Sequence, residues 1–128
     1  MEDQDSYILK EPDKVYDIKH RSYAFSKSIV LYCGSVKFDR IHSSIFDQLV
    51  RSGTSIGANL VEGRAGSSVN DFLRYYTIAL KSANETKYWL CLIRDTIDID
   101  NKTIKELIQE ADEISKIIAK IIISTRSY

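Results

Sequence analysis

Residues 72 to 97 carry the most regular pattern in the chain, a stripe of apolar and small side chains that repeats every seven residues for almost four heptads. Its members are Phe72, Tyr76, Ala79, Ala83, Thr86, Leu90, Ile93 and Ile97. A second stripe beside it contains Tyr75, Ile78, Ser82, Glu85, Trp89 and Leu92. Steps of three and four residues place side chains on one face of an α-helix. A helix with two such stripes needs neighbouring helices on two sides.

Three other segments show the same spacing of apolar side chains and are predicted to be helices. They run from about residue 14 to 36, from 40 to 62 and from 102 to 125. With one proline and five glycines, the chain has few residues that break helices. We therefore predict an all-α fold, an antiparallel up-down four-helix bundle formed by residues 14–128. Residues 1–13 are acidic and aperiodic, and we expect them to form a flexible N-terminal tail.

The glycines fall at positions that the bundle can use. Gly53 and Gly57 lie four residues apart on the second predicted helix, so they share one face and permit close approach of another backbone. A helix break at Gly53 is the alternative, but the apolar stripe keeps its phase across both glycines. Residues 63–66 are predicted to turn through a left-handed helix end. Ser68 and Asp71 resemble a capping box that opens the third helix.

Most enzyme classes lack their sequence signals here. The chain contains no Gly-x-Ser-x-Gly motif, no Walker-type phosphate loop and no Gly-x-Gly-x-x-Gly motif. Glu62 and Glu85 lie on antiparallel helices, roughly 20 Å apart along the bundle axis at ~1.5 Å per residue. Tyr88 stands where the Glu-x-x-His motif of di-iron bundles needs a histidine. We predict that the protein is not an enzyme and assign no catalytic, cofactor-binding or substrate-binding residue.

Metal and membrane sites are not indicated either. Cys33 and Cys91 lie within apolar helical patterns, which is typical of buried free thiols, and His20 and His42 have no partner at ligand spacing. No apolar run approaches the ~20 residues that span a bilayer. The acidic N-terminus lacks a signal-peptide pattern. We expect a cytoplasmic protein without a cofactor or a structural metal.

Polar residues interrupt the apolar faces of the second and third helices. They are Ser55, Asn59, Glu62, Asn84 and Glu85. Buried polar groups need hydrogen-bond partners, so a network that fixes helix register or a contact between subunits is the plainer interpretation. A ligand-binding constellation is the sharper one, and no residue identifies its ligand.

Charge is unevenly distributed in a chain whose 18 basic and 18 acidic residues balance. Residues 1–13 carry one basic and five acidic residues, residues 14–64 carry eight and four, and residues 65–128 carry nine of each. The basic middle segment is a candidate phosphate contact. A mixed charge pattern on helix exteriors also fits an ordinary solvated surface.

Two motifs resemble those of a known family. Residues 55–63 read SIGANLVEG, and Asp71-Phe72 are followed by IALKSANETKYWL at residues 78–90. This combination resembles the bacterial four helix bundle protein family, whose first described members are encoded in intervening sequences of 23S ribosomal RNA genes. The resemblance covers about residues 15 to 123. It implies antiparallel bundles that assemble into homopentamers. This agrees with the second stripe of the third helix and with the wide apolar arc at the end of the fourth, which contains Ile114, Ile117, Ile118, Ile121 and Ile122.

The family is also similar in fold to the accessory variability proteins of diversity-generating retroelements, which bind nucleic acid through basic surfaces. By the same logic, the candidate RNA or DNA contacts in this chain are Arg51, Arg64, Arg74, Lys81, Lys87 and Arg94. The candidate helix-packing or subunit contacts are Gly53, Gly57, Asn59, Glu62, Tyr76, Glu85 and Trp89. The leading hypothesis is a non-enzymatic homo-oligomeric scaffold that contacts RNA or DNA. The alternative is a structural or protein-interaction adaptor without affinity for nucleic acid.

Overall fold

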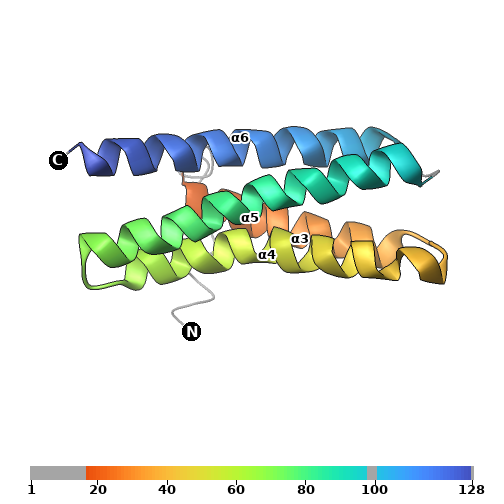
Figure 1. The fold of residues 1–128 in the computed structure, drawn as a ribbon, viewed down its shortest axis with the longest axis horizontal. Coiled ribbons are helices and arrows are strands. Elements are labelled where there is room, and N and C mark those ends of the chain that lie inside the picture. The colour runs from red at the N-terminus through yellow and green to blue at the C-terminus, as the bar shows by residue number, and fades with distance from the viewer. Residues whose placement is uncertain (1–16, 98–100, 128) are drawn as a thin grey trace.

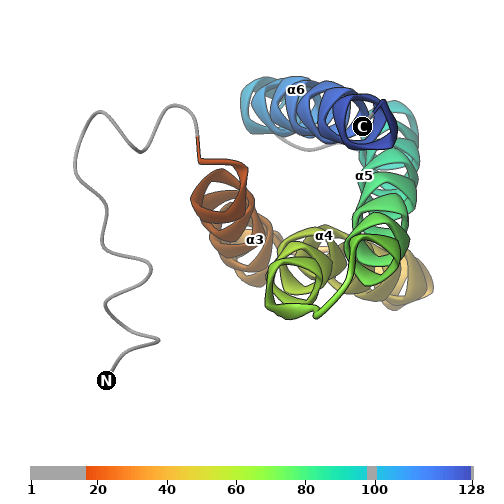
Figure 2. The same cartoon turned by 90° about the vertical axis from the view of Figure 1, so that its left-hand side faces the viewer.

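The computed structural model describes residues 17–97 and 101–127, and these form the predicted four-helix bundle (Figure 1). The helices are α3 (Ile18–Ser35), α4 (Ser43–Ala65), α5 (Val69–Thr96) and α6 (Asn101–Arg126), with a 3-10 turn η1 (Arg40–His42) before α4. Each helix runs antiparallel to the next, and the end-on view places them in the order α3, α4, α5, α6 around the bundle (Figure 2). The acidic tail predicted for residues 1–13 lies outside the described residues.

Local hydrogen bonds explain where two of the helices begin. The Asp17 carboxylate accepts a hydrogen bond of 3.0 Å from the backbone N–H of Lys19, so α3 starts at Ile18. The Ser68 hydroxyl accepts one of 3.1 Å from the N–H of Asp71, so α5 starts at Val69 as predicted. Each cap satisfies a donor that the first helical turn leaves without a partner.

The end of α4 differs from the prediction. The helix is continuous through Gly53 and extends to Ala65, so Gly63 and Arg64 are helical and do not belong to the turn. Gly66 has a φ of −65°, and its N–H donates to the carbonyl oxygen of Gly63 at 3.3 Å. The left-handed helix end was wrong, because the described residues contain no backbone with a positive φ.

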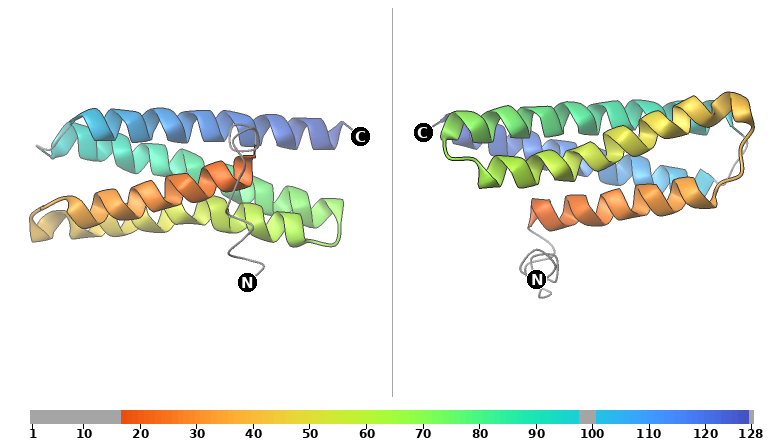
Figure 3. Two further views of the ribbon diagram at one scale, coloured as in Figure 1. Left: turned by 180° about the vertical axis from the view of Figure 1, so that it is seen from behind. Right: turned by 90° about the horizontal axis from the view of Figure 1, so that it is seen from below.

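The core follows the seven-residue stripe of α5. Tyr76, Ala79, Ala83, Leu90 and Ile93 are buried on this helix, where they meet apolar side chains from the other helices. The principal partners on those helices are Phe25, Ile29, Leu49, Ile56, Leu60, Ile104, Ala111, Ile114 and Ile118. The second stripe of α5 is covered only in part, because Ser82 is buried and Trp89 packs against the core, whereas Ile78 is exposed. The α4–α5 contact is the most extensive of the bundle, and α3, the shortest helix, makes the smallest contact with α6 (Figure 3).

Three glycines of α4 lie at close contacts, but to different degrees. A Cβ atom added at Gly53 would lie 3.1 Å from the side chain of Ile29 on α3. At Gly57 it would lie 3.5 Å from the backbone of Ser22, which is an ordinary contact. At Gly63 it would lie 2.9 Å from the ring of Tyr76 on α5, which is too close. The tightest approach therefore occurs at the glycine that we expected in the turn.

Candidate nucleic-acid interface

Neutral hydroxyl and amide groups link α4 to α5. The Asn59 side-chain amide donates to the carbonyl oxygen of Ser55 at 2.8 Å and contacts the Ser55 hydroxyl at 2.9 Å. The Ser55 hydroxyl lies 2.9 Å from the hydroxyl of Ser82. One turn further along the pair, the Thr86 hydroxyl lies 3.0 Å from that of Ser52. These groups satisfy one another, so they form an internal network that joins two helices.

The polar residues predicted for these helices divide into two groups. Ser55 and Asn59 belong to the network, whereas Glu62 and Asn84 are exposed. Glu85 lies at the edge of the helix pair, where its carboxylate accepts hydrogen bonds from Arg51 at 3.0 Å and from the Trp89 indole at 2.9 Å.

Four of the six predicted phosphate contacts form ion pairs. Arg51 pairs with Glu85 at 3.0 Å, Lys87 with Asp112 at 3.2 Å, and Arg94 with Asp95 at 2.8 Å. Arg94 holds the pKa of Asp95 below its usual range through this hydrogen bond.

The fourth pair joins Arg74 to Asp71 at 3.7 Å, and the Arg74 guanidinium also lies 4.4 Å from the centre of the Tyr75 ring. Arg64 and Lys81 are exposed and have no ion-pair partner among residues 17–97 and 101–127. Burial raises the pKa of Tyr76, and a hydrogen bond with Arg64 opposes that rise.

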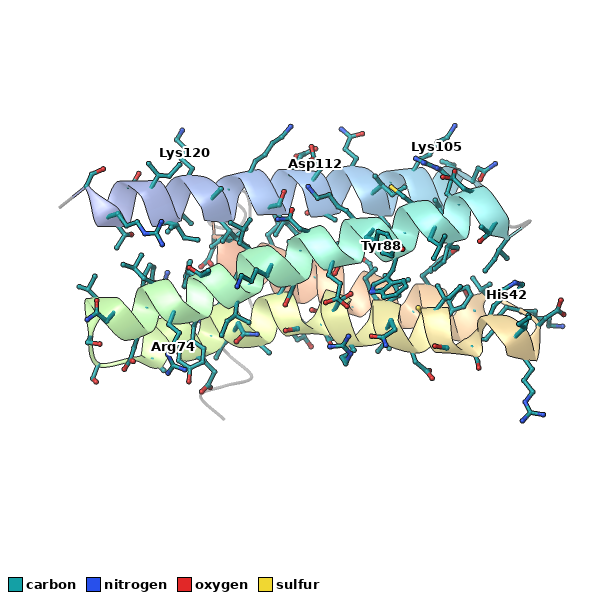
Figure 4. The ribbon with its side chains drawn as sticks, in the orientation of Figure 1. His42, Arg74, Tyr88, Lys105, Asp112 and Lys120 are labelled. Carbon is teal, nitrogen blue, oxygen red and sulfur yellow. The ribbon has the colours of Figure 1, made fainter. Side chains whose placement is uncertain are left out.

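The six residues do not form one patch. Arg51 lies at the contact of α4 with α5, whereas Lys87 lies at the contact of α5 with α6. Arg74 and Tyr88 mark two separate points along α5 (Figure 4). Because these residues lie at different helix contacts, the predicted set does not form a continuous phosphate-binding surface.

The helix that the sequence prediction left out carries a more regular set of cations. Lys105, Lys116 and Lys120 are exposed on α6, and Lys116 pairs with Asp112 at 2.9 Å. Neither Lys105 nor Lys120 forms an ion pair with any residue that the structure describes. The apolar periodicity of this segment does not reveal them. The charged residues of the segment, arranged by helical period, would have revealed these lysines.

The bundle is more basic than the whole chain. Of the 18 basic and 18 acidic residues, two basic and five acidic residues lie in residues 1–16. Residues 17–128 therefore hold 16 basic residues against 13 acidic ones, a net charge of +3. The neutrality of the sequence conceals a cationic helical domain.

Other kinds of site find little support in the described part of the chain. A groove of about 230 Å³ between α3 and α4 is lined by Tyr23, Thr54 and Gly57 among others. Within the described ranges, no three His, Cys, Asp or Glu side chains are placed to hold a metal ion. Burial raises the pKa of the Cys33 thiol to about 11, which makes this cysteine a poor nucleophile. None of the described helices combines the length and the hydropathy that crossing a membrane requires.

Comparisons with known proteins agree with this architecture. A model of the family described as 23S rRNA-intervening sequence protein matches residues 14–120. No curated protein matches the chain. A crystal structure at 1.70 Å resolution, of a protein of unknown function from the S23 ribosomal protein family of Bacteroides thetaiotaomicron, is 36% identical in sequence. That comparison covers 82% of this chain and 97% of the other, with a TM-score of 0.73. The two chains share their fold over most of their length.

Proposed function

The chain belongs to the 23S rRNA-intervening sequence protein family, and from this premise we propose that it is a non-enzymatic, self-associating scaffold that binds RNA or DNA. The observation that carries the nucleic-acid part is the net charge of +3 on residues 17–128, in a chain that is neutral as a whole. A cationic helical surface attracts phosphate without regard to sequence and releases counterions when it binds. The family description names 23S rRNA, which makes RNA the first probe to use.

Exposed apolar side chains support the self-association part. Ile41 is 81% exposed and Ile123 is 66% exposed. Leu31, Val69 and Tyr88 are each more than half exposed as well. Contact with further copies of the chain would remove these groups from water. We propose a homopentamer, the assembly implied by the family resemblance.

Binding and assembly are tested separately. Nucleic-acid binding is measured by fluorescence anisotropy with labelled single-stranded and duplex RNA and DNA at ~50 mM and ~200 mM salt. Contacts with six to ten phosphates would weaken binding by about 10³ to 10⁵ over that range. Light scattering coupled to size exclusion gives the assembly, and a species at the monomer mass of 14.7 kDa would refute self-association.

One observation favours a second candidate, a protein-interaction adaptor. Four of the six basic residues predicted from sequence are paired with carboxylates, as on an ordinary solvated surface. If the protein assembles but binds neither RNA nor DNA at low salt, the adaptor is the function that remains.

A further inference from the structure

The surface of α6 is divided by charge. Lys105, Gln109, Asp112, Lys116 and Lys120 follow one another in steps of three and four residues, so they form one stripe along the helix. Figure 4 shows Lys105, Asp112 and Lys120 on the side of α6 that faces away from the rest of the bundle. At ~1.5 Å per residue, the stripe from Lys105 to Lys120 is roughly 22 Å long. We call these five residues the α6 stripe.

The acidic residues of α6 are directed mainly to neighbouring helices. Glu110 and Glu113 bind Arg21 of α3, at distances of 2.7 Å each. Asp112, the only acid in the stripe, accepts from Lys87 of α5 at 3.2 Å and pairs with Lys116 at 2.9 Å. These two lysines hold the pKa of Asp112 below its usual range, with Lys116 the larger cause.

The lysines of the stripe have no such partners on other helices. Lys105 and Lys120 form no ion pair in the described part of the chain, and the Lys116 side chain is 75% exposed despite its contact with Asp112. Two acidic residues border the stripe: Glu106 is exposed about 100° round the helix from Lys105, and Glu113 accepts from Gln109 of the stripe at 3.3 Å while it pairs with Arg21. The stripe therefore presents positive charge outward while its one carboxylate is compensated.

We propose that the α6 stripe is the surface on which the phosphate backbone of a nucleic-acid duplex binds. This proposal rests on the proposed function and adds the site and the form of the ligand. Lysine acts as a point charge toward phosphate and needs no bidentate geometry. A straight convex row of such charges suits the regular phosphate array of a duplex, which carries one charge per ~1.7 Å of its axis.

The α6 stripe contains no aromatic residue, which favours a duplex over a single strand as its ligand. Single-stranded ligands gain much of their affinity by stacking bases on aromatic side chains. The five positions of the stripe hold three lysines, one glutamine and one aspartate. The exposed tyrosines Tyr23 and Tyr88 lie on α3 and α5, away from it. The stripe therefore contacts backbone phosphates and does not read bases.

The test compares two triple variants with equal loss of charge. The first is Lys105→Gln/Lys116→Gln/Lys120→Gln, and the control is Lys27→Gln/Lys37→Gln/Arg40→Gln, at exposed positions elsewhere. Both are titrated with a fluorescent RNA duplex and a DNA duplex of the same sequence over a range of salt. We expect the first variant to bind DNA at least about tenfold more weakly at low salt. Its slope of log K against log salt should be shallower by about 2.7, at ~0.9 for each lost phosphate contact. The control should keep the wild-type slope.

The outcomes separate the site from the function. If the first variant binds as tightly as the wild type, or if the control loses as much affinity as the first variant, the α6 stripe is not the binding surface. The proposed function is then left intact. Binding to single strands alone overturns the duplex assignment. Failure of the wild-type protein to bind any RNA or DNA overturns both proposals, even if the stripe proves to bind anionic lipid vesicles.

Two further variants guard against trivial loss of structure. Lys105→Arg/Lys116→Arg/Lys120→Arg keeps the charge and should bind as the wild type does. The single variant Lys120→Gln changes one exposed side chain and should reduce the DNA slope by about 0.9. Far-ultraviolet circular dichroism checks that each variant remains helical. If the arginine variant lost binding, the positive charge of the stripe alone would not account for binding, and the proposal would be wrong.

Discussion

The α4–α5 pair and the α3–α6 pair are both antiparallel contacts of the same bundle, yet different chemistry joins them. Between α4 and α5 the buried polar links are neutral and include Thr86, whose hydroxyl lies 3.0 Å from that of Ser52, while the Arg51–Glu85 ion pair lies at the exposed edge. Between α3 and α6 they are charged, since Arg21 makes hydrogen bonds of 2.7 Å and 2.8 Å to Glu110 and one of 2.7 Å to Glu113.

The closeness of packing also differs between the two helix pairs. Gly63 brings α4 so close to α5 that the ring of Tyr76 occupies the space of its missing side chain. Beside α3, in contrast, a groove of about 760 Å³ is lined by Leu31 and Tyr32 of α3 and by Thr103 of α6. Helices joined by a short turn can specify contact through close packing. Helices far apart in sequence use longer side chains whose charges reach across a looser contact.

The largest expected effect tests the close packing of α4 against α5. Gly63→Ala would place a Cβ atom 2.9 Å from Cδ1 of Tyr76, whose ring is buried and stacked on Phe72 at 4.0 Å. Overpacking should cost about 1 to 3 kcal/mol, and alanine's better helix propensity returns about 1 kcal/mol of this. We therefore expect the free energy of unfolding to fall by up to about 2 kcal/mol. Urea denaturation measures the change.

Gly57→Ala is the matched control on the same helix. Its Cβ atom would lie 3.5 Å from the Ser22 backbone, so the packing cost is small and the gain in helix propensity remains. The control should be neutral or more stable than the wild type. Equal destabilisation of both variants would show that the contact with Tyr76 is not special.

A smaller effect tests the neutral network of the same pair. Thr86→Val keeps the shape of a fully buried side chain but removes the hydroxyl beside Ser52 and the carbonyl oxygen of Ser82. We expect a loss of about 1 kcal/mol in the free energy of unfolding. Adding Ser52→Ala should cost less than the two single changes together, because both partners of one hydrogen bond are then absent. Strict additivity in this double-mutant cycle would contradict a Ser52–Thr86 bond.

Much of this fold could be predicted from the sequence, because helical periodicity and caps are local. The seven-residue stripe of α5 and the Ser68 cap both stand as predicted. The end of α4 could not be predicted, because Gly63 is helical and is needed there to leave room for the ring of Tyr76 from another helix. A turn glycine and a packing glycine look alike in sequence.

The candidate interface was less predictable, for a physical reason. Whether Lys87 is available to a ligand depends on Asp112, which is 25 residues away and belongs to another helix. Such pairing depends on the relative rotation of two helices, which the sequence does not show. The α6 stripe, in contrast, follows from the spacing of residues along one helix and could have been found before the structure.

The smallest effect tests the charged contact between α3 and α6. The side chain of Arg21 is 24% exposed and that of Glu110 is 33% exposed, so solvent screens this ion pair only in part. Arg21→Met should lower the free energy of unfolding at pH 7 by about 1 kcal/mol, the upper end of the range for exposed pairs. Lys27→Met, at an exposed position of α3, should change it by less than about 0.5 kcal/mol.

The dependence on pH shows whether charge carries that effect. The hydrogen bond from Arg21 lowers the pKa of Glu113. A carboxylate with a lowered pKa stabilises the fold above its unfolded pKa of about 4.3, and the stabilisation is lost as the pH falls through the folded pKa. The difference between the wild type and Arg21→Met should therefore be full at pH 7 and shrink toward pH ~3 in urea titrations. A difference that stays constant would mean that Arg21 joins α3 to α6 through the packing of its aliphatic stem.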